Sequence, residues 1–208
     1  MENRTPPVLD SPDQSAKISR REIAKMLLAA APALALPAGI SAHPIWQHLA
    51  NHEVLDAADA QLDSANWKPL FLTAAQEQSL RALAEIVVPG STQAHVSRFI
   101  DLLLSVDRTV AQQKFLGSLT TFDEEATKQF GKPFGRLDQN QAIELVTRFA
   151  NAPRSGGLEA ILRGRLEDLK EWISGAYYSS EIGMRELGWT PDRVFATFPV
   201  CSHPDGHV

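Results

Sequence analysis

The chain has 208 residues, of which 44% are apolar and 22% are charged, and its formal net charge is −5. The length suits one domain with a short appendage, and the composition excludes collagen-like, coiled-coil and wholly disordered proteins. The single cysteine excludes an internal disulfide, a zinc site with two or more thiolates and an iron–sulfur cluster. The negative charge, with no run of four Lys or Arg, argues against binding to nucleic acid. Dinucleotide-binding, P-loop, nucleophile-elbow and H-E-x-x-H motifs do not occur, so the chain does not read as a self-sufficient enzyme.

The first 42 residues have the pattern of an export signal. Residues 1–18 are polar, and an apolar stretch of eleven residues, 26–36, follows a basic segment. That stretch is too short for a bilayer span, which needs about 20 apolar residues. The basic segment fits the twin-arginine signal, which a receptor reads and which carries folded proteins. The matching residues are Ser19, Arg20, Arg21, Ile23 and Lys25. Cleavage is expected after Ala42, with Ile40 at the −3 position, and Ala38 is the second choice.

The remaining chain is predicted to be helical. Thr73-x-x-Gln76 and Asp138-x-x-Gln141 are capping boxes, and Pro89-Gly90 and Gly131 each end a helix. Ser91 or Thr92 is expected to cap a further helix. Apolar residues recur at the spacing of a helix face. The expected faces are Leu80, Leu83, Ala84 and Val87; Val96, Phe99, Ile100 and Leu103; Phe115, Leu119, Phe122 and Ala126; Ile143, Val146, Phe149 and Ala150; and Leu158, Ile161, Leu162, Leu166, Leu169 and Ile173.

These patterns predict an all-α protein, a small bundle of about five or six helices. Residues 43–70 are expected to form a linker with a loose helix whose apolar stripe is poor. Residues 71–208 are expected to form the helical domain with its tail. After Ser174 the tail is predicted to be irregular because Gly and Pro interrupt it, and residues 172–207 are expected to form the main contact with a partner.

Aromatic residues are concentrated in this tail and favour a contact with another protein. Gly188 and the polar residues near the chain end are assigned to the same surface. The predicted partner interface comprises Trp172, Tyr177, Tyr178, Gly188, Trp189, Phe195, Phe198, Cys201, His203 and His207. The alternative to this partner contact is that the aromatic residues of the tail fold back onto the chain's own bundle.

Two groups of residues could hold a metal ion. His48 and His52, four residues apart, could share a helix face with Asp56 and Asp59, although an exposed polar face on a weak N-terminal helix is the preferred explanation. Cys201, His203 and His207 could ligate zinc or copper. Cys201 could instead form a disulfide with another chain or be inert, and all three readings stay open. We therefore assign no metal site, no catalytic residue and no cofactor-binding residue to this chain.

The other titratable residues suggest no catalytic arrangement. Glu124, Glu125, Glu167, Asp168 and Glu171 lie on helices near Lys and Arg and are expected to form solvated ion pairs. Ser179 and Ser180 have no His or Lys close in sequence to activate them.

Several of these segments resemble one known family. The leader is followed by Leu83-Ala84-Glu85-Ile86-Val87-Val88-Pro89-Gly90, later by Gly175-Ala176-Tyr177-Tyr178-Ser179-Ser180 and Gly183-Met184-Arg185-Glu186-Leu187-Gly188-Trp189, and at the end by Phe198-Pro199-Val200-Cys201-x-His203. Together they are similar to the gluconate 2-dehydrogenase subunit 3 family, the small subunits of bacterial flavin-dependent sugar dehydrogenases. Val200 departs from the glycine expected before the cysteine.

The resemblance implies that this chain is not the catalyst. A large subunit of the glucose–methanol–choline type would hold FAD and oxidise a sugar or polyol, and a cytochrome c subunit, where present, would pass electrons to the membrane. The small subunit would escort the large one through the twin-arginine translocation machinery to the periplasm. The alternative is a stand-alone exported metal-binding or redox protein that uses Cys201, His203 and His207.

Overall fold

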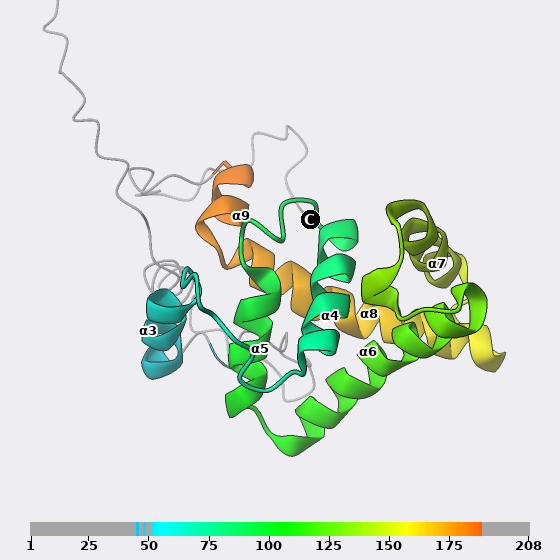
Figure 1. Cartoon of the computed structure of the whole chain (residues 1–208), viewed down its shortest axis with the longest axis horizontal. Helices are drawn as coiled ribbons and strands as arrows, with labels where there is room; N and C mark the ends of the chain where they lie inside the picture. Colours follow the sequence, from blue (N-terminus) through cyan, green and yellow to red (C-terminus); the bar gives the residue numbers. More distant parts are fainter. Residues whose placement is uncertain (1–44, 46–47, 49–50, 189–208) are drawn as a thin grey trace, which may run out of the picture.

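The computed structural model describes residues 45, 48 and 51–188 (Figure 1). These residues form seven α-helices and one short 3-10 helix and contain no strand, which confirms the prediction of an all-α protein. In chain order the elements are α3 (His52–Gln61), α4 (Ala74–Val87), α5 (Val96–Val106), α6 (Thr109–Phe130), η1 (Phe134–Arg136), α7 (Gln139–Asn151), α8 (Gly157–Tyr178) and α9 (Glu181–Glu186).

Both predicted capping boxes are present. The Gln76 amide N–H donates to the Thr73 hydroxyl at 3.2 Å, and the Gln76 side chain accepts from the Thr73 amide at 2.9 Å. Asp138 and Gln141 make the same reciprocal pair at the start of α7. Each pair satisfies amide groups that a helix start otherwise leaves open. The helix after each box therefore begins where the sequence predicts it.

The start of α5 differs from the prediction. The helix begins at Val96, and neither Ser91 nor Thr92 caps it. The Ser91 hydroxyl instead donates to the Val88 carbonyl at 2.6 Å, and the Glu85 carboxylate accepts the amide N–H groups of Gly90 and Thr92, each at 2.8 Å. These contacts hold the segment between α4 and α5 in turns, and α5 therefore begins later than predicted.

α8 is the central element, since α4, α5, α6, α7 and α9 all pack against it (Figure 1). Its later apolar residues are buried, but Leu158 and Ile161 near its start are 58% and 55% exposed. The expected face of α7 is also rotated, because Ile143 and Ala150 point outward while Ala142, Leu145 and Phe149 are buried. Which side of a helix is covered depends on its neighbours.

The first described segment packs more firmly than expected. The inner residues Val54, Leu55 and Ala58 of α3 are buried, and α3 contacts α5 of the same chain.

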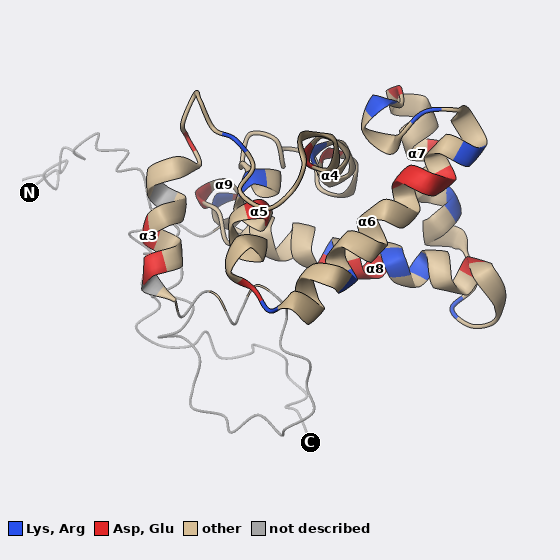
Figure 2. Cartoon of the chain, turned by 60° about the horizontal axis from the view of Figure 1, so that its bottom comes forward, with Lys and Arg blue, Asp and Glu red and all other residues tan. Residues whose placement is uncertain are grey.

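Acidic and basic residues are interspersed along α6 and α8 (Figure 2). Over the residues that the structure describes, we find no helix with the length and apolar content to cross a membrane.

Candidate functional site

The end of the bundle at α8 and α9 carries the described part of the predicted partner interface. α8 ends at Tyr178, and the Ser179 and Ser180 hydroxyls donate to the carbonyls of Ala176 and Tyr177. The Ser180 hydroxyl oxygen also accepts the Gly183 amide N–H at 3.1 Å and so caps α9. Both serines are buried, so they are structural caps rather than candidate nucleophiles.

Gly183 lets α9 fold back onto the end of α8. A Cβ atom at this position would lie 2.8 Å from the carbonyl carbon of Tyr177 and 2.9 Å from the Cα of Tyr178. Only a residue without a side chain permits this approach of two backbones. The glycine therefore permits the tight turn between α8 and α9.

Tyr177 lies in the interior beneath this turn. Its side chain is 4% exposed, and burial, together with the nearby Glu186 carboxylate, raises the pKa of its hydroxyl to about 12. A Cβ atom on Gly90 would lie 3.3 Å from the same hydroxyl oxygen. The phenol thus stays protonated at neutral pH and acts as a packing residue between α8 and the loop after α4.

Trp172 is also a core residue. Its side chain is 6% exposed, and its ring meets that of Phe115 edge to face at 5.6 Å. The prediction of an irregular tail after Ser174 is wrong as far as Tyr178, because α8 continues to that point and α9 follows. The i, i+4 pattern of α8 carries on through Trp172, Ile173, Ala176 and Tyr177. We therefore reassign Trp172 and Tyr177 from the partner interface to the core.

Two apolar side chains remain exposed at this end. Tyr178 is 36% exposed and packs edge to face on Tyr177 at 5.2 Å, and Leu187 is 64% exposed. Gly188, with φ +76°, follows directly. We call Tyr178 and Leu187 the α9 surface. The other predicted interface residues lie outside the described part of the chain: Trp189, Phe195, Phe198, Cys201, His203 and His207. The predicted export signal also lies outside it, with the signal residues Ser19, Arg20, Arg21, Ile23 and Lys25 and the cleavage residue Ala42.

His48 does not belong to an exposed polar face. It is 7% exposed, its Nε2 lies 3.3 Å from the Asp107 Oδ2, and its ring lies 6.4 Å from that of Trp172. The side chains of His52 and Asp59 are outside what the structure describes. Within the described part of the chain, we find no group of three or more His, Cys, Asp or Glu placed to hold a metal ion.

The acidic helix residues pair between helices as well as along them. Glu125 of α6 forms an ion pair with Arg148 of α7 and another with Lys128, and the Arg148 guanidinium lowers the pKa of Glu125. Asp168 of α8 meets Lys114 of α6 at 2.7 Å. These pairs join α6 to α7 and α8 and so help to fix the bundle, which sequence spacing alone did not indicate.

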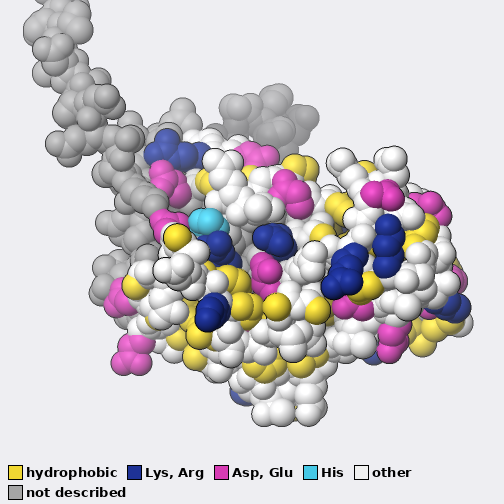
Figure 3. Space-filling view, in the orientation of Figure 1, with side chains coloured by type: hydrophobic (Ala, Val, Ile, Leu, Met, Phe, Trp, Pro, Cys, Tyr) yellow, Lys and Arg dark blue, Asp and Glu magenta, His cyan; other side chains and the backbone are white. Residues whose placement is uncertain are grey.

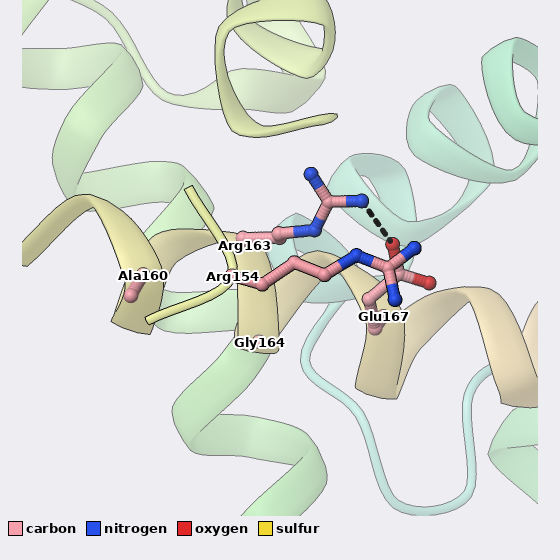
Figure 4. Close-up of a pocket in the computed structure, with 5 residues that line it drawn as sticks. All are labelled: Arg154, Ala160, Arg163, Gly164 and Glu167. Carbon is pink, nitrogen blue, oxygen red and sulfur yellow. Dashed lines mark ion pairs between the residues drawn. The ribbon is translucent and has the colours of Figure 1, made fainter. Parts of the chain in front are cut away.

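A surface groove of about 320 Å³ runs along the first half of α8 (Figure 4). Its lining residues are Arg154, Ala160, Arg163, Gly164 and Glu167. The Arg163 guanidinium donates to the carbonyls of Ala150 and Ala152 at 2.7 and 2.8 Å and pairs with Glu167 at 3.9 Å. It therefore serves as a cap for the end of α7, and the groove lacks the apolar walls of a typical small-molecule site.

The most buried acidic side chain of the described residues was not recognised from the sequence. Asp101 of α5 is fully buried, and its carboxylate accepts the amide N–H groups of Leu70, Phe71 and Leu72 at 2.6, 3.1 and 2.7 Å. The available signal was an aspartate inside the apolar run from Phe99 to Leu104. Such a carboxylate must find donors inside the protein, and here it fixes the loop before α4.

The same loop is held by Arg98 of α5 and by His95, the residue directly before α5. Arg98 donates to the carbonyls of Leu62 and Ser64 and stacks over the Trp67 ring at 5.1 Å. His95, which has a φ of 53°, places its Nε2 3.1 Å from an Asp63 carboxylate oxygen. The polar side chains of α5 are therefore accounted for by structural contacts.

On the face shown in Figure 3, hydrophobic side chains lie in small groups among charged ones.

Comparison with known proteins gives one family match. The model of gluconate 2-dehydrogenase subunit 3 matches residues 74–192, which includes every helix from α4 to α9. No curated protein and no solved structure matches. The match covers more than half of the chain, and the resemblance seen in the sequence is confirmed. The chain thus belongs to the gluconate 2-dehydrogenase subunit 3 family and, as a member, is a subunit of such a dehydrogenase complex.

Proposed function

We propose that this chain is the non-catalytic small subunit of a periplasmic FAD-dependent dehydrogenase that oxidises a sugar or polyol. It escorts the catalytic large subunit, of the glucose–methanol–choline type, through the twin-arginine pathway and stabilises it afterwards. The observation that carries the proposal is the combination of the family match over residues 74–192 with the twin-arginine pattern at Arg20-Arg21. FAD belongs to the large subunit, and a cytochrome c subunit, where present, links the complex to the membrane.

The polar residues of the bundle support a non-catalytic role. The buried Asp101, Ser179 and Ser180 each hold backbone groups of their own fold. The Tyr177 hydroxyl, with a pKa of about 12, is a poor general base at neutral pH. Each of these side chains has a structural contact that explains why it is buried.

The α9 surface is the described part of the proposed contact with the large subunit. Leu187 exposes apolar area two residues before Trp189, and Tyr178, the last residue of α8, exposes part of its ring. Further aromatic residues, Phe195 and Phe198, follow in the sequence. Tyrosine and tryptophan are the side chains most often found at the energetic centre of interfaces. Cys201, His203 and His207 are proposed to lie in the same contact.

Export of the partner tests the escort role. Replacing Arg20 and Arg21 together by Lys keeps the charge but removes the receptor-read pair. Both this chain and the large subunit are then expected to stay in the cytoplasm, as cell fractionation and immunoblotting measure. A large subunit that still reaches the periplasm would show that it does not depend on this chain for export.

Purification of the complex tests the catalytic assignment. The isolated small subunit is expected to show no flavin absorbance and no sugar-dependent reduction of a dye, whereas the complex shows both. Turnover by the isolated chain would refute the non-catalytic role. Stoichiometric zinc or copper in the isolated chain, lost in a Cys201→Ser variant, would favour the metal-binding alternative.

A further inference from the structure

Two acidic side chains from different helices lie close to the buried hydroxyl of Tyr177. Glu85 is in the last turn of α4, and Glu186 is the last residue of α9. After burial, the largest cause, the Glu186 carboxylate and more weakly the Glu85 carboxylate raise the pKa of this hydroxyl. The ends of α4 and α9 therefore meet at one buried phenol, and both lie on the same side of the bundle (Figure 1).

The turn that follows α4 is held against the end of α8. The Glu85 carboxylate accepts the amide N–H groups of Gly90 and Thr92, each at 2.8 Å. Gly90 has a φ of +90°, and a Cβ atom there would lie 3.3 Å from the Tyr177 hydroxyl oxygen. The Tyr177 ring in turn meets that of Tyr178 edge to face. The turn after α4 and the α9 surface are thus parts of one continuous surface.

This surface carries negative charge that the described chain does not balance. Residues 85–93 and 178–188 contain three acidic residues and one basic residue, a formal net charge of −2. The basic residue, Arg185, pairs with Glu181 at 2.7 Å. Among the described residues, neither Glu85 nor Glu186 forms an ion pair with Lys, Arg or His. Both side chains are exposed, so a cation from another molecule can approach them and would be attracted by both.

Apolar side chains lie beside these two carboxylates. Leu187 is 64% exposed next to Glu186, and Tyr178 exposes 36% of its surface. Apolar area with charged groups at its edge is the usual make-up of a protein interface. We propose that Glu85, Glu186 and the α9 surface together receive an arginine of the large subunit, set among apolar side chains. A guanidinium can pair with a carboxylate and also stack on an exposed tyrosine ring. The inference rests on the proposed function and specifies the chemistry of the contact.

Capture of the large subunit by charge variants tests the inference. The full chain carries an affinity tag, is produced together with the large subunit and is captured from whole-cell extracts, so that export does not affect the result. Leu187→Lys and Leu187→Glu remove the same apolar side chain and differ in charge alone. Glu186→Gln removes one carboxylate, and Glu159→Gln is its control in the first turn of α8, roughly 28 Å along the helix from Tyr178. Flavin retained per captured chain is measured after washing at about 50 mM and about 500 mM NaCl.

At low salt we expect Leu187→Lys to retain about 10-fold less flavin than Leu187→Glu, and Glu186→Gln roughly 3- to 10-fold less than the native chain. Glu159→Gln should match the native chain, and high salt should narrow both differences. Equal retention by the two Leu187 variants, or more by the Lys variant, would overturn the inference. Native retention by Glu186→Gln, or an equal loss in Glu159→Gln, would overturn it too. A native chain that captures no flavin-containing subunit would instead refute the proposed function.

Discussion

The Asp101 carboxylate accepts the Leu70 amide N–H at 2.6 Å and so joins the middle of α5 to a loop 31 positions earlier. The other carboxylate oxygen accepts the amides of Phe71 and Leu72, and the aspartate is fully buried. Three donors on one carboxylate hold the chain in place directly before the Thr73 capping box.

Asp101→Asn tests this contact. An asparagine would turn an NH₂ group towards at least one of the three amide donors, which leaves donors facing each other in the interior. We expect a loss of about 2–4 kcal/mol in the free energy of unfolding, or about 4–16 °C in Tm. Thermal melts of the full chain measure it, with the exposed Glu171→Gln as the control. Equal melts for both variants would contradict the role of Asp101.

Two glycine substitutions should change stability in opposite directions. Gly183→Ala would push a methyl group into the backbone at Tyr177 and Tyr178, and we expect a loss of roughly 1–3 kcal/mol. Gly164→Ala lies in α8 with nothing within 4 Å of the new methyl group, so a gain of about 0.5–1 kcal/mol is expected from helix propensity. Denaturant unfolding of the two variants compares them directly. A Gly183→Ala protein as stable as the native one would show that α9 need not approach α8 so closely.

Substitutions of Trp172 and Tyr178 should distinguish a core residue from an interface residue. Trp172→Ala removes a buried ring and should cost roughly 3–5 kcal/mol, or about 6–20 °C in Tm. Tyr178→Ala, at a 36% exposed position, should change the melt little but weaken capture of the large subunit. Val110→Ala is the control for capture, because this 79% exposed position belongs to the first turn of α6, a helix whose start lies away from α9 in Figure 1. Unchanged capture by Tyr178→Ala would remove that residue from the proposed contact.

The buried Tyr177 hydroxyl is expected to ionise only at strongly alkaline pH. The chain has two tyrosines, so Tyr178→Phe leaves Tyr177 as the single phenol. Its tyrosinate absorbance should appear with a midpoint near pH 12 in the folded protein, against an ordinary value of 10. Because the folded-state pKa is raised, its stabilising effect is complete below pH 10 and is lost as the pH rises towards 12. A midpoint near 10 while circular dichroism still reports a folded chain would contradict the burial of the hydroxyl.

Local contacts were predictable from the sequence. The capping boxes at Thr73 and Asp138 and the helix end at Gly131 involve residues at most four positions apart, and all three occur in the structure. Their donors and acceptors are fixed by the helix geometry itself, so no distant residue is needed to recognise them. The all-α class follows from the same local periodicity.

Burial was decided by tertiary contacts. The sequence assigned Leu158 to a core face and Trp172 to a partner interface, and the structure exposes the first and buries the second. Both lie on α8, but Trp172 packs edge to face against Phe115 of α6, whereas Leu158 in the first turn stays 58% exposed. Likewise, Asp101 finds its donors 29 to 31 positions away. By itself the sequence determined the helical class, the capped helix starts at Thr73 and Asp138 and the helix end at Gly131. The packing of distant segments decided which side chains the helices enclose, because burial requires a neighbour that local sequence does not specify.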